Sequence, residues 1–284
     1  MRVLLVHIEE VFREAAARWT LIGYFLLSSI FILIFGLAVN LDIVDGALAG
    51  AKLFGNEVDM GGQRVDLDKL VLGFESSFAA FLYLIGTFLA IFATAHLVPR
   101  LQDKGTIDLY LSRPTGRVRL LLARYVAGLV LAATNIVYLL GTIWLIVIWK
   151  TGIVHPRFLL AGVVIMLVIA TLLAFAFLIG TVTSSTAVSI MGSYGLFFFS
   201  AMLVSHEQIE AVVDKLWKAR VIHGLYVALP KTAELGRATI ALVSGGEAPV
   251  QVTGTVTASP FISTALFGLA CLALAGFVFH RKEF

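Results

Sequence analysis

Few residues in this chain have the types and spacing that catalysis needs. Residues 206–210 read His-Glu-Gln-Ile-Glu and begin like the zinc-protease motif H-E-x-x-H. That motif binds zinc through a second imidazole four residues after the first, and residue 210 is a glutamate. Residues 192–195 read Gly-Ser-Tyr-Gly and depart from the G-x-S-x-G pattern that presents a nucleophilic serine. We therefore expect no catalytic residue, no metal ligands and no cofactor bound by this chain itself.

Polar groups inside the apolar segments could serve a transport pathway. Five uncharged candidates are Tyr83, Thr87, Asn135, Tyr138 and Thr142. They could line a translocation path, or they could hydrogen-bond one helix to another, which is the interpretation we favour. Glu75, His96 and Arg124 stand near segment ends, where snorkelling to the interface is expected. No carboxylate stands at mid-depth, which argues against a proton-coupled carrier.

A short element between two apolar segments, residues 99–118, has the features of a docking helix. Gly105 frees the backbone, Thr106 is a natural N-cap, and Asp108 suits the positive end of a helix dipole. Pro114 then ends the helix. Its apolar side chains are more numerous than an exposed loop needs: Ile107, Leu109, Tyr110 and Leu111. The element could be a docking surface ringed by arginines, or a well-packed loop on the positive side of a membrane.

The same element resembles the cytoplasmic motif of ABC-2-type transporter permeases. In that motif an acidic residue precedes Gly-Thr, hydrophobic residues surround a second acidic residue, and Ser-x-Pro and a basic residue follow. The matching positions are Asp103, Gly105, Thr106, Asp108, Leu109, Tyr110, Ser112, Arg113, Pro114 and Arg117. Two positions depart from the family pattern, because glutamate is more common at Asp103 and serine is common at Gly116.

The resemblance implies a mechanism and a set of partners. In that family the short helix is a coupling helix seated in a groove of a separate ATP-binding subunit. Two permeases, identical or different, and two ATPase subunits make the transporter, and ATP and Mg²⁺ are bound by the ATPases. The matching residues would then form the contact with the ATPase. The sequence agrees, because it contains no G-x-x-x-x-G-K-[ST] motif of its own.

Composition indicates a membrane protein. The 284-residue chain is 60% hydrophobic and 14% charged, with a mean hydropathy of +0.97, whereas soluble domains are about 45–50% apolar and about 25% charged. A soluble fold of this size could not bury so much apolar surface, which excludes soluble and disordered classes. A net charge of +3 is too small to indicate nucleic-acid binding. The single cysteine, Cys271, leaves no disulfide framework.

Six apolar segments have the length of about 20 residues with which a helix crosses a bilayer. They are residues 19–39, 76–98, 120–149, 158–182, 187–204 and 260–279. Because backbone groups in lipid must be satisfied within the segment, the expected fold class is an all-α integral membrane protein. Residues 1–284 are expected to form one transmembrane domain in contact with membrane lipid. The first segment is too long for a cleavable signal peptide.

Charge distribution sets the expected orientation. Basic residues gather in three regions: Arg2, Arg13 and Arg18; Arg100, Lys104, Arg113, Arg117 and Arg119; and Arg281 and Lys282. The loop at residues 40–75 holds seven acidic residues against three basic ones. We therefore expect a multi-pass protein of the cell membrane with both termini and the turn at residues 183–186 in the cytoplasm. Residues 205–259 would then form an outer segment.

Two further regions are expected to be helical. Residues 1–18 show apolar side chains at helical spacing and indicate an amphipathic helix in the cytoplasmic interface. In the outer segment, residues 209–221 predict a helix that ends at Gly224. A second outer helix is expected from Thr232, as its N-cap, to the residue before Gly245. An amphipathic N-terminal helix, six spans and an irregular outer helical segment before the last span also match the ABC-2 topology.

Together these patterns and the resemblance favour the permease subunit of an ABC-2-type transporter that works in export. One alternative is a membrane-embedded enzyme, for which the sequence offers no catalytic set. Another is a non-transporting anchor or sensor on the same scaffold. An apolar pathway suits lipids, amphipathic drugs or polymers.

Overall fold

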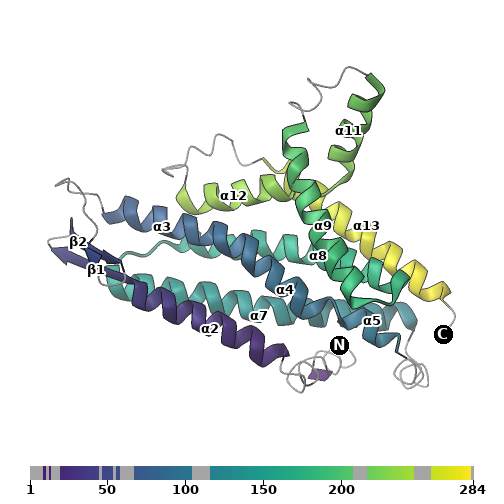
Figure 1. Ribbon diagram of the computed structural model, residues 1–284, viewed down its shortest axis with the longest axis horizontal. Coiled ribbons are helices and arrows are strands. Elements are labelled where there is room, and N and C mark those ends of the chain that lie inside the picture. Colours follow the sequence, from purple (N-terminus) through teal and green to yellow (C-terminus); the bar gives the residue numbers. More distant parts are fainter. Residues whose placement is uncertain are drawn as a thin grey trace.

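The computed structural model describes residues 20–44, 47–53, 56–57, 67–103, 116–206, 216–245 and 257–282, together with Glu9, Glu10 and Arg13. These residues are mostly helical, and the predicted helical membrane fold is confirmed (Figure 1). The rest of the predicted interfacial helix, residues 1–18, lies outside the described residues. Among the described residues of this region, Arg13 Nη2 lies 2.6 Å from Glu9 Oε1, an ion pair at the i, i+4 spacing of a helix.

Five helical segments in the described ranges are long and apolar enough to cross a membrane. They are Val71–Leu101, Arg117–Thr151, Pro156–Thr183, Thr186–Ser205 and Ser259–Arg281. Another apolar helix, α2 (Thr20–Ala38), precedes them and contains the shorter apolar stretch Ile22–Ile34. Its 19 residues extend over about 28 Å, which is close to the bilayer core of about 30 Å. Six crossings therefore stay a prediction, with five candidates and α2 as the sixth helix.

The segment that contains the second predicted span is built from four parts. α3 (Leu67–Phe81) continues into a π-helical turn, η1 (Leu82–Gly86). After this turn come α4 (Thr87–Thr94) and the short α5 (Leu97–Leu101). A π-helical turn adds a residue to one turn of helix and so changes the direction in which the next side chains point.

The other long helices extend slightly beyond the apolar segments from which they were predicted. They are α7 (Arg117–Thr151), α8 (Leu160–Thr183) preceded by η2 (Pro156–Leu159), α9 (Thr186–Met202) followed by η3 (Leu203–Ser205), and α13 (Ser259–Arg281). α7 ends at Gly152, whose φ of +73° is the left-handed conformation that glycine adopts readily. α9 begins after Ser185, whose Oγ accepts a hydrogen bond from the Val188 backbone N–H.

α8 forms the centre of the bundle. It packs against α13, α9, α12, α7 and α4, and it is apolar on all sides, as expected of a helix surrounded by others. α13 approaches it closely at Gly268, where an added Cβ would lie 3.1 Å from Thr171 Oγ1 and 3.2 Å from Thr171 Cα. Small residues at such crossings let two membrane helices come into close contact.

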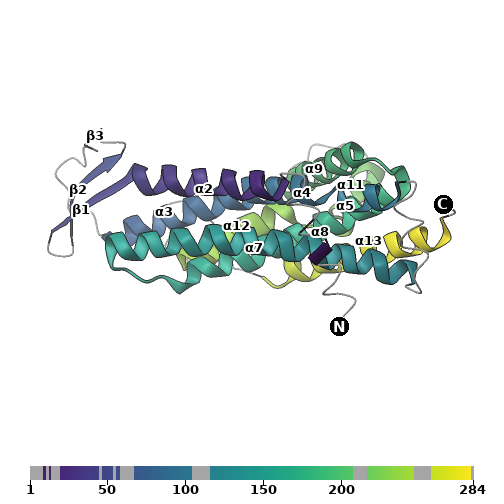
Figure 2. The ribbon, with the colours of Figure 1, turned by 90° about the horizontal axis from the view of Figure 1, so that it is seen from below.

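A small sheet follows α2 at one end of the bundle, as Figure 2 shows. β1 (Val39–Val44) pairs antiparallel with β2 (Ala47–Leu53), which pairs antiparallel with β3 (Asn56–Glu57). Only an acidic loop was expected here from the sequence. The alternation of Val39, Leu41 and Ile43 with polar residues was the signal for a strand.

Two further helices lie between α9 and α13. α11 (Leu216–Ala228) projects away from the other helices in Figure 1. It continues past Gly224, which was wrongly expected to end it, and the expected start at residue 209 lies outside the described residues. α12 (Thr232–Ser244) ends at Gly245, with φ +61°, as expected. Its N-cap is Lys231 and not Thr232, because the Thr232 hydroxyl donates to the Phe197 carbonyl, 3.1 Å away.

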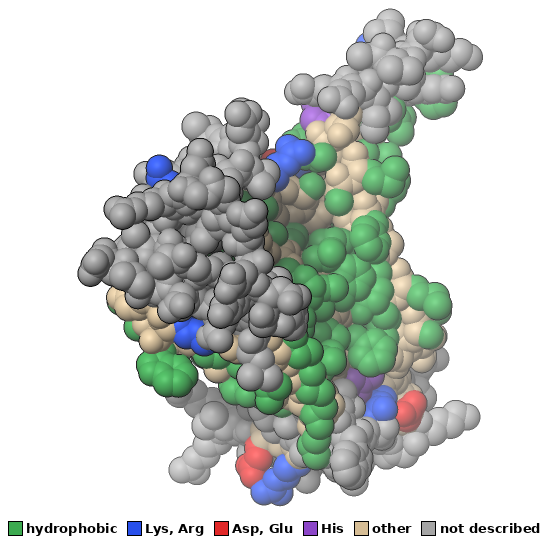
Figure 3. Space-filling model, turned by 60° about the vertical axis from the view of Figure 1, so that its left-hand side comes forward, with side chains coloured by type: hydrophobic (Ala, Val, Ile, Leu, Met, Phe, Trp, Pro, Cys, Tyr) green, Lys and Arg blue, Asp and Glu red, His purple; other side chains and the backbone are tan. Residues whose placement is uncertain are grey.

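The exterior of the bundle is apolar. Figure 3 shows a broad band of hydrophobic side chains, with the charged side chains of that face lying mostly near its borders. Large apolar residues point outward from several helices: Leu33, Phe92, Val137, Val163 and Leu269. Such a surface is stable only in an apolar solvent, which a lipid bilayer provides.

Candidate functional site

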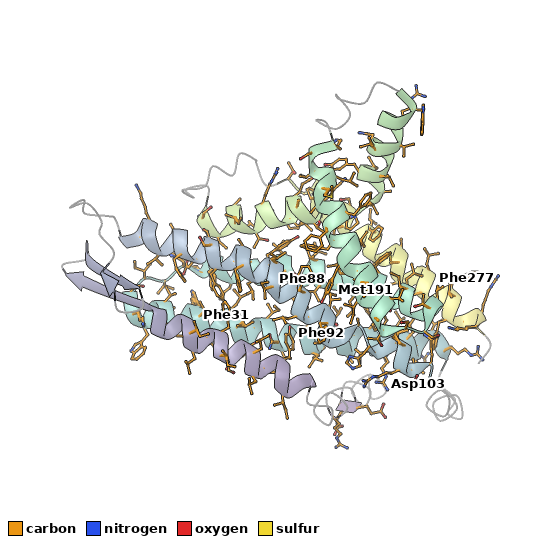
Figure 4. All side chains as sticks on the ribbon, viewed as in Figure 1. Phe31, Phe88, Phe92, Asp103, Met191 and Phe277 are labelled. Carbon is orange, nitrogen blue, oxygen red and sulfur yellow. The ribbon has the colours of Figure 1, made fainter. Side chains whose placement is uncertain are left out.

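The two ends of the docking element lie at one end of the bundle. Asp103 follows α5 and is exposed, and Figure 4 labels it at the end of the bundle where Figure 1 marks the C-terminus. Gly116 is extended, with φ −63° and ψ 138°, and directly precedes α7. The intervening predicted contact residues lie outside the described residues: Gly105, Thr106, Asp108, Leu109, Tyr110, Ser112, Arg113 and Pro114. Their role stays a prediction. The structure describes the residues at the two ends of the docking element and their contacts, which we call its base.

Lys282 organises this base on the side of α5. Its Nζ donates to Gln102 Oε1 at 2.5 Å, to the Thr181 carbonyl at 2.8 Å and to Ser184 Oγ at 2.8 Å. Ser184 Oγ also donates to Gln102 Oε1 at 2.8 Å, and Gln102 Nε2 donates to the Gly180 carbonyl at 2.9 Å. Hydrogen bonds from a charged donor are stronger than those between neutral groups. Partial burial lowers the pKa of the Lys282 ammonium, because desolvation disfavours its charged form.

Arg117 completes the base on the side of α7. Its Nη1 donates to the Lys282 carbonyl at 2.7 Å and lies 3.4 Å from the His280 carbonyl. Lys282 therefore contacts both ends of the docking element: Gln102 near its start through the side chain, and Arg117 near its end through the backbone. We call the group of Gln102, Arg117, Ser184 and Lys282 the basal junction.

Close packing holds α5 in place next to the basal junction. Pro99 and Leu101 are buried, and an added Cβ at Gly180 of α8 would lie 3.1 Å from Pro99 Cδ. The same Cβ would lie 3.0 Å from Ser189 Oγ of α9. Only glycine leaves room for α5, α8 and α9 to meet here, so a displacement of α5 is passed to both neighbours.

Arg117 is the one member of the basal junction that was predicted from the sequence as a contact residue, whereas Gln102, Ser184 and Lys282 were not. Lys282 was counted only as a cytoplasmic charge, and Ser184 only as part of a tight turn. Ser184 has a φ of +53°, which is uncommon for a serine, and its hydroxyl contacts both Lys282 and Gln102. Nothing local in the sequence pairs Gln102 with Lys282, which stand 180 residues apart.

Among the pathway candidates, Asn135 and Tyr138 connect α7 to α2. Asn135 is fully buried, and its Oδ1 accepts a hydrogen bond from Ser28 Oγ at 3.0 Å. Tyr138 Oη lies 2.9 Å from Ser29 Oγ. Both contacts are of the helix-to-helix kind that intramembrane polar residues make. Whether these residues also line a path stays a prediction.

Tyr83 lies in the π-helical turn, and its Oη donates to the backbone carbonyl of Thr232 at the start of α12. Its ring lies against Gly236, where an added Cβ would meet Tyr83 Cε1 at 3.1 Å. The next candidate, Thr87, is buried at the start of α4, and its hydroxyl has no hydrogen-bond partner within the described part of the chain. Thr142 is half-buried on α7.

The expectation that Glu75, His96 and Arg124 reach the interface is wrong. All three are buried, with Glu75 only 1% exposed. Glu75 Oε2 lies 3.0 Å from His155 Nδ1, in the connection between α7 and α8. A partner 80 residues away in sequence removes the need to snorkel, and position within the apolar segment could not reveal it.

The described residues contain no group of three or more His, Cys, Asp or Glu side chains that could hold a metal ion. Cys271 is free and buried. The described residues form a helical bundle with an apolar exterior, and hydrogen bonds join both ends of the docking element to Lys282.

A comparison with protein families gives one match. The model described as ABC-2 family transporter protein matches residues 12–284, nearly the whole chain. No curated protein matches the chain.

Proposed function

This chain belongs to the ABC-2 family of transporter proteins, and we propose that it is the permease subunit through which a separate ATPase drives export. Family membership makes it a multi-pass permease component of an ABC transporter rather than an enzyme. The proposal adds that residues 99–118 dock into the ATP-binding subunit, which holds ATP and Mg²⁺. We further propose that the transporter contains two ATPase copies and a second permease, identical or different. The chain would lie in the cell membrane with both termini cytoplasmic.

The observation that carries the proposal is the basal junction. Lys282 bonds to Gln102 near the start of the coupling element, and Arg117 near its end bonds to the Lys282 carbonyl. A loop with no mechanical role has no need for both of its ends to be fastened to the last helix. An element that receives force from a partner needs such a base, because otherwise its movement would be absorbed locally.

Through the basal junction, a movement of the coupling element can be transmitted to three helices of the bundle. The Lys282 ammonium joins α13 to the α8–α9 turn through Ser184, and Arg117 begins α7. Gln102 continues α5, which is packed against α8 at Gly180. A shift of the coupling element by closure of the ATPases would therefore move α5, α7 and α13 together, which is the rigid-body kind of switching.

Co-expression with the ATPase encoded by a neighbouring gene tests the proposal. The double substitution Asp108→Ala/Leu109→Arg removes a charge and an apolar side chain from the proposed contact and should leave membrane insertion intact. We expect the variant to recover about tenfold less ATPase on purification, because interface anchors commonly contribute more than 1 kcal/mol. Lys69→Ala, an exposed change on α3, is the matched control and should recover as much ATPase as the wild type. Equal recovery by an inserted double variant would contradict the coupling role.

A further inference from the structure

The buried Glu75 lies at the opposite end of the bundle from the basal junction. It belongs to α3, which packs against η2 and α12 at the end where α7 finishes (Figure 1). A glutamate that is 1% exposed inside an apolar helix is costly, and such residues commonly mark a functional site. The proposed coupling role makes no use of it.

Glu75, His155 and Asp68 form a linear group in which the imidazole lies between two carboxylates. His155 Nδ1 is 3.0 Å from Glu75 Oε2, and His155 Nε2 is 3.3 Å from Asp68 Oδ1. Both carboxylates belong to α3, whereas His155 belongs to the connection between α7 and α8. The group therefore joins two parts of the bundle.

The backbone of His155 is held in place independently of its side chain. Trp144 Nε1 of α7 donates to the His155 carbonyl at 3.1 Å. Pro156 follows and disfavours a helical conformation at His155, which has φ −108° and ψ 92°. The backbone that carries the imidazole is thus held next to α3.

Counting protons shows what this geometry requires. A neutral imidazole has one N–H donor and one lone pair, and an ionised carboxylate only accepts. With two ionised carboxylates and a neutral ring, one nitrogen lone pair would face a carboxylate oxygen and one contact would be repulsive. Both contacts are satisfied when one additional proton is present, either on the ring or on Glu75. The second oxygen, Glu75 Oε1, is buried without a hydrogen-bond partner among the described residues, which favours a carboxyl group that is not ionised.

We propose that Glu75, His155 and Asp68 form a proton-binding latch that fastens α3 to the α7–α8 connection. With the proton bound, both nitrogens of His155 are paired and the two parts are held together. Loss of the proton to water leaves a nitrogen lone pair of His155 facing one of the two carboxylates, so that one contact becomes repulsive and α3 is released. This role goes beyond coupling to an ATPase, because it makes the opening of this end of the bundle depend on pH.

Water has access to the latch from one side. A cavity of about 280 Å³ is lined by Asp68, His155 and Arg157, together with Ser244 and Gly245 at the end of α12. This volume holds several water molecules, at about 30 Å³ each in the liquid. The charged groups around the imidazole are the two carboxylates and, in the same cavity, Arg157, while Lys69 is exposed on α3. Because the closed latch holds one more proton than the open latch, the latch opens as the pH rises.

Cysteine labelling of the purified chain in nanodiscs tests the latch without any ATPase. Leu72, which is half-buried and lines the cavity, is replaced by cysteine in a Cys271→Ser background and treated with a polar maleimide. Val154→Cys, at a residue that is 56% exposed, corrects for the pH dependence of the thiol reaction itself. We expect the corrected rate to be about threefold or more higher at about pH 8.5 than at about pH 5.5, the range across which histidine commonly titrates.

Two variants predict opposite fixed states. Glu75→Gln supplies an amide N–H to His155 Nδ1 and should keep labelling low at both pH values. His155→Phe removes both contacts and should give high labelling at both pH values, provided that the variant elutes as a single peak like the wild type. Lys69→Gln is the matched control and should retain the wild-type response. A wild-type rate that does not change with pH, or a Glu75→Gln variant that keeps the pH response, would overturn the proposal, and these two results suffice even if His155→Phe does not fold.

Discussion

Single residues far apart in sequence define the two ends of this molecule. Lys282 and Gln102 meet at the basal junction, and Glu75 and His155 meet at the other end. Each of these contacts places a polar group in partly or fully buried surroundings, where an unsatisfied partner is costly. Substitutions at these positions should therefore change the link between elements more than they change the elements themselves.

Replacement of Lys282 with alanine should weaken coupling. The change removes three hydrogen bonds but leaves the apolar part of α13 intact. Because the ammonium is partly exposed, we expect a loss of about 1 kcal/mol, which corresponds to about a fivefold decrease in permease-stimulated ATPase activity. Arg281→Ala is the matched control, since the Arg281 guanidinium lies over the Phe277 ring rather than in the junction. Equal effects of the two substitutions would show that charge alone matters.

The hydrogen bond between Asn135 and Ser28 distinguishes helix pairing from pathway lining. A double-mutant cycle with Asn135→Ala and Ser28→Ala should give a coupling energy of about 0.6–2 kcal/mol in unfolding measurements, as expected for a bond between membrane helices. Thr134→Ala is the control, because Thr134 bonds only within α7, to the Val130 carbonyl. A coupling energy near zero would remove the case for helix pairing and leave the pathway interpretation.

At the scale of elements, the sequence predicted what depends on local pattern. Apolar length located the long helices, and Gly245 marked the end of α12. The π-helical turn at Leu82–Gly86 could not be predicted from local pattern, because its residue Tyr83 donates a hydrogen bond to Thr232, 149 positions away. The same is true of Glu75 and of the basal junction, whose partners lie on other helices. Only the small sheet after α2 had a local signal that went unused, the alternation in residues 39–44.

The close approach of α13 to α8 gives a prediction at this scale. Gly268→Ala would place a methyl group 3.2 Å from Thr171 Cα, a backbone atom that cannot rotate away. We expect a loss of about 1–3 kcal/mol in the free energy of unfolding, seen as a lower melting temperature in detergent. Gly141→Ala should be neutral or slightly stabilising, because no atom lies within 4 Å of the added Cβ. A Gly268→Ala variant as stable as Gly141→Ala would contradict this packing.

At the scale of the whole molecule, charge distribution predicts the orientation in the membrane. Cysteines introduced at residue 59 and residue 115 report on opposite sides. An impermeant maleimide added to intact cells should label the first, in the acidic loop, and should label the second only after the membrane is permeabilised. The reverse pattern would place the coupling element outside the cell, away from ATP.

The family match and the bundle together describe a membrane permease component of an ABC transporter, and we propose that its energy comes from another chain. The basal junction supports the coupling element on one side of the membrane, and the proposed proton-binding latch closes the other end. Each end can be perturbed separately, because none of their residues is shared.

A site-specific photocrosslink tests the central claim of coupling most directly. A photoreactive residue is placed at Tyr110, within the coupling element, or at Lys69, at the opposite end of the bundle, in cells that also express the ATPase. The account predicts a crosslinked product of permease and ATPase from position 110 and none from position 69. An inserted chain that gives no product from position 110, or equal product from both positions, would contradict it.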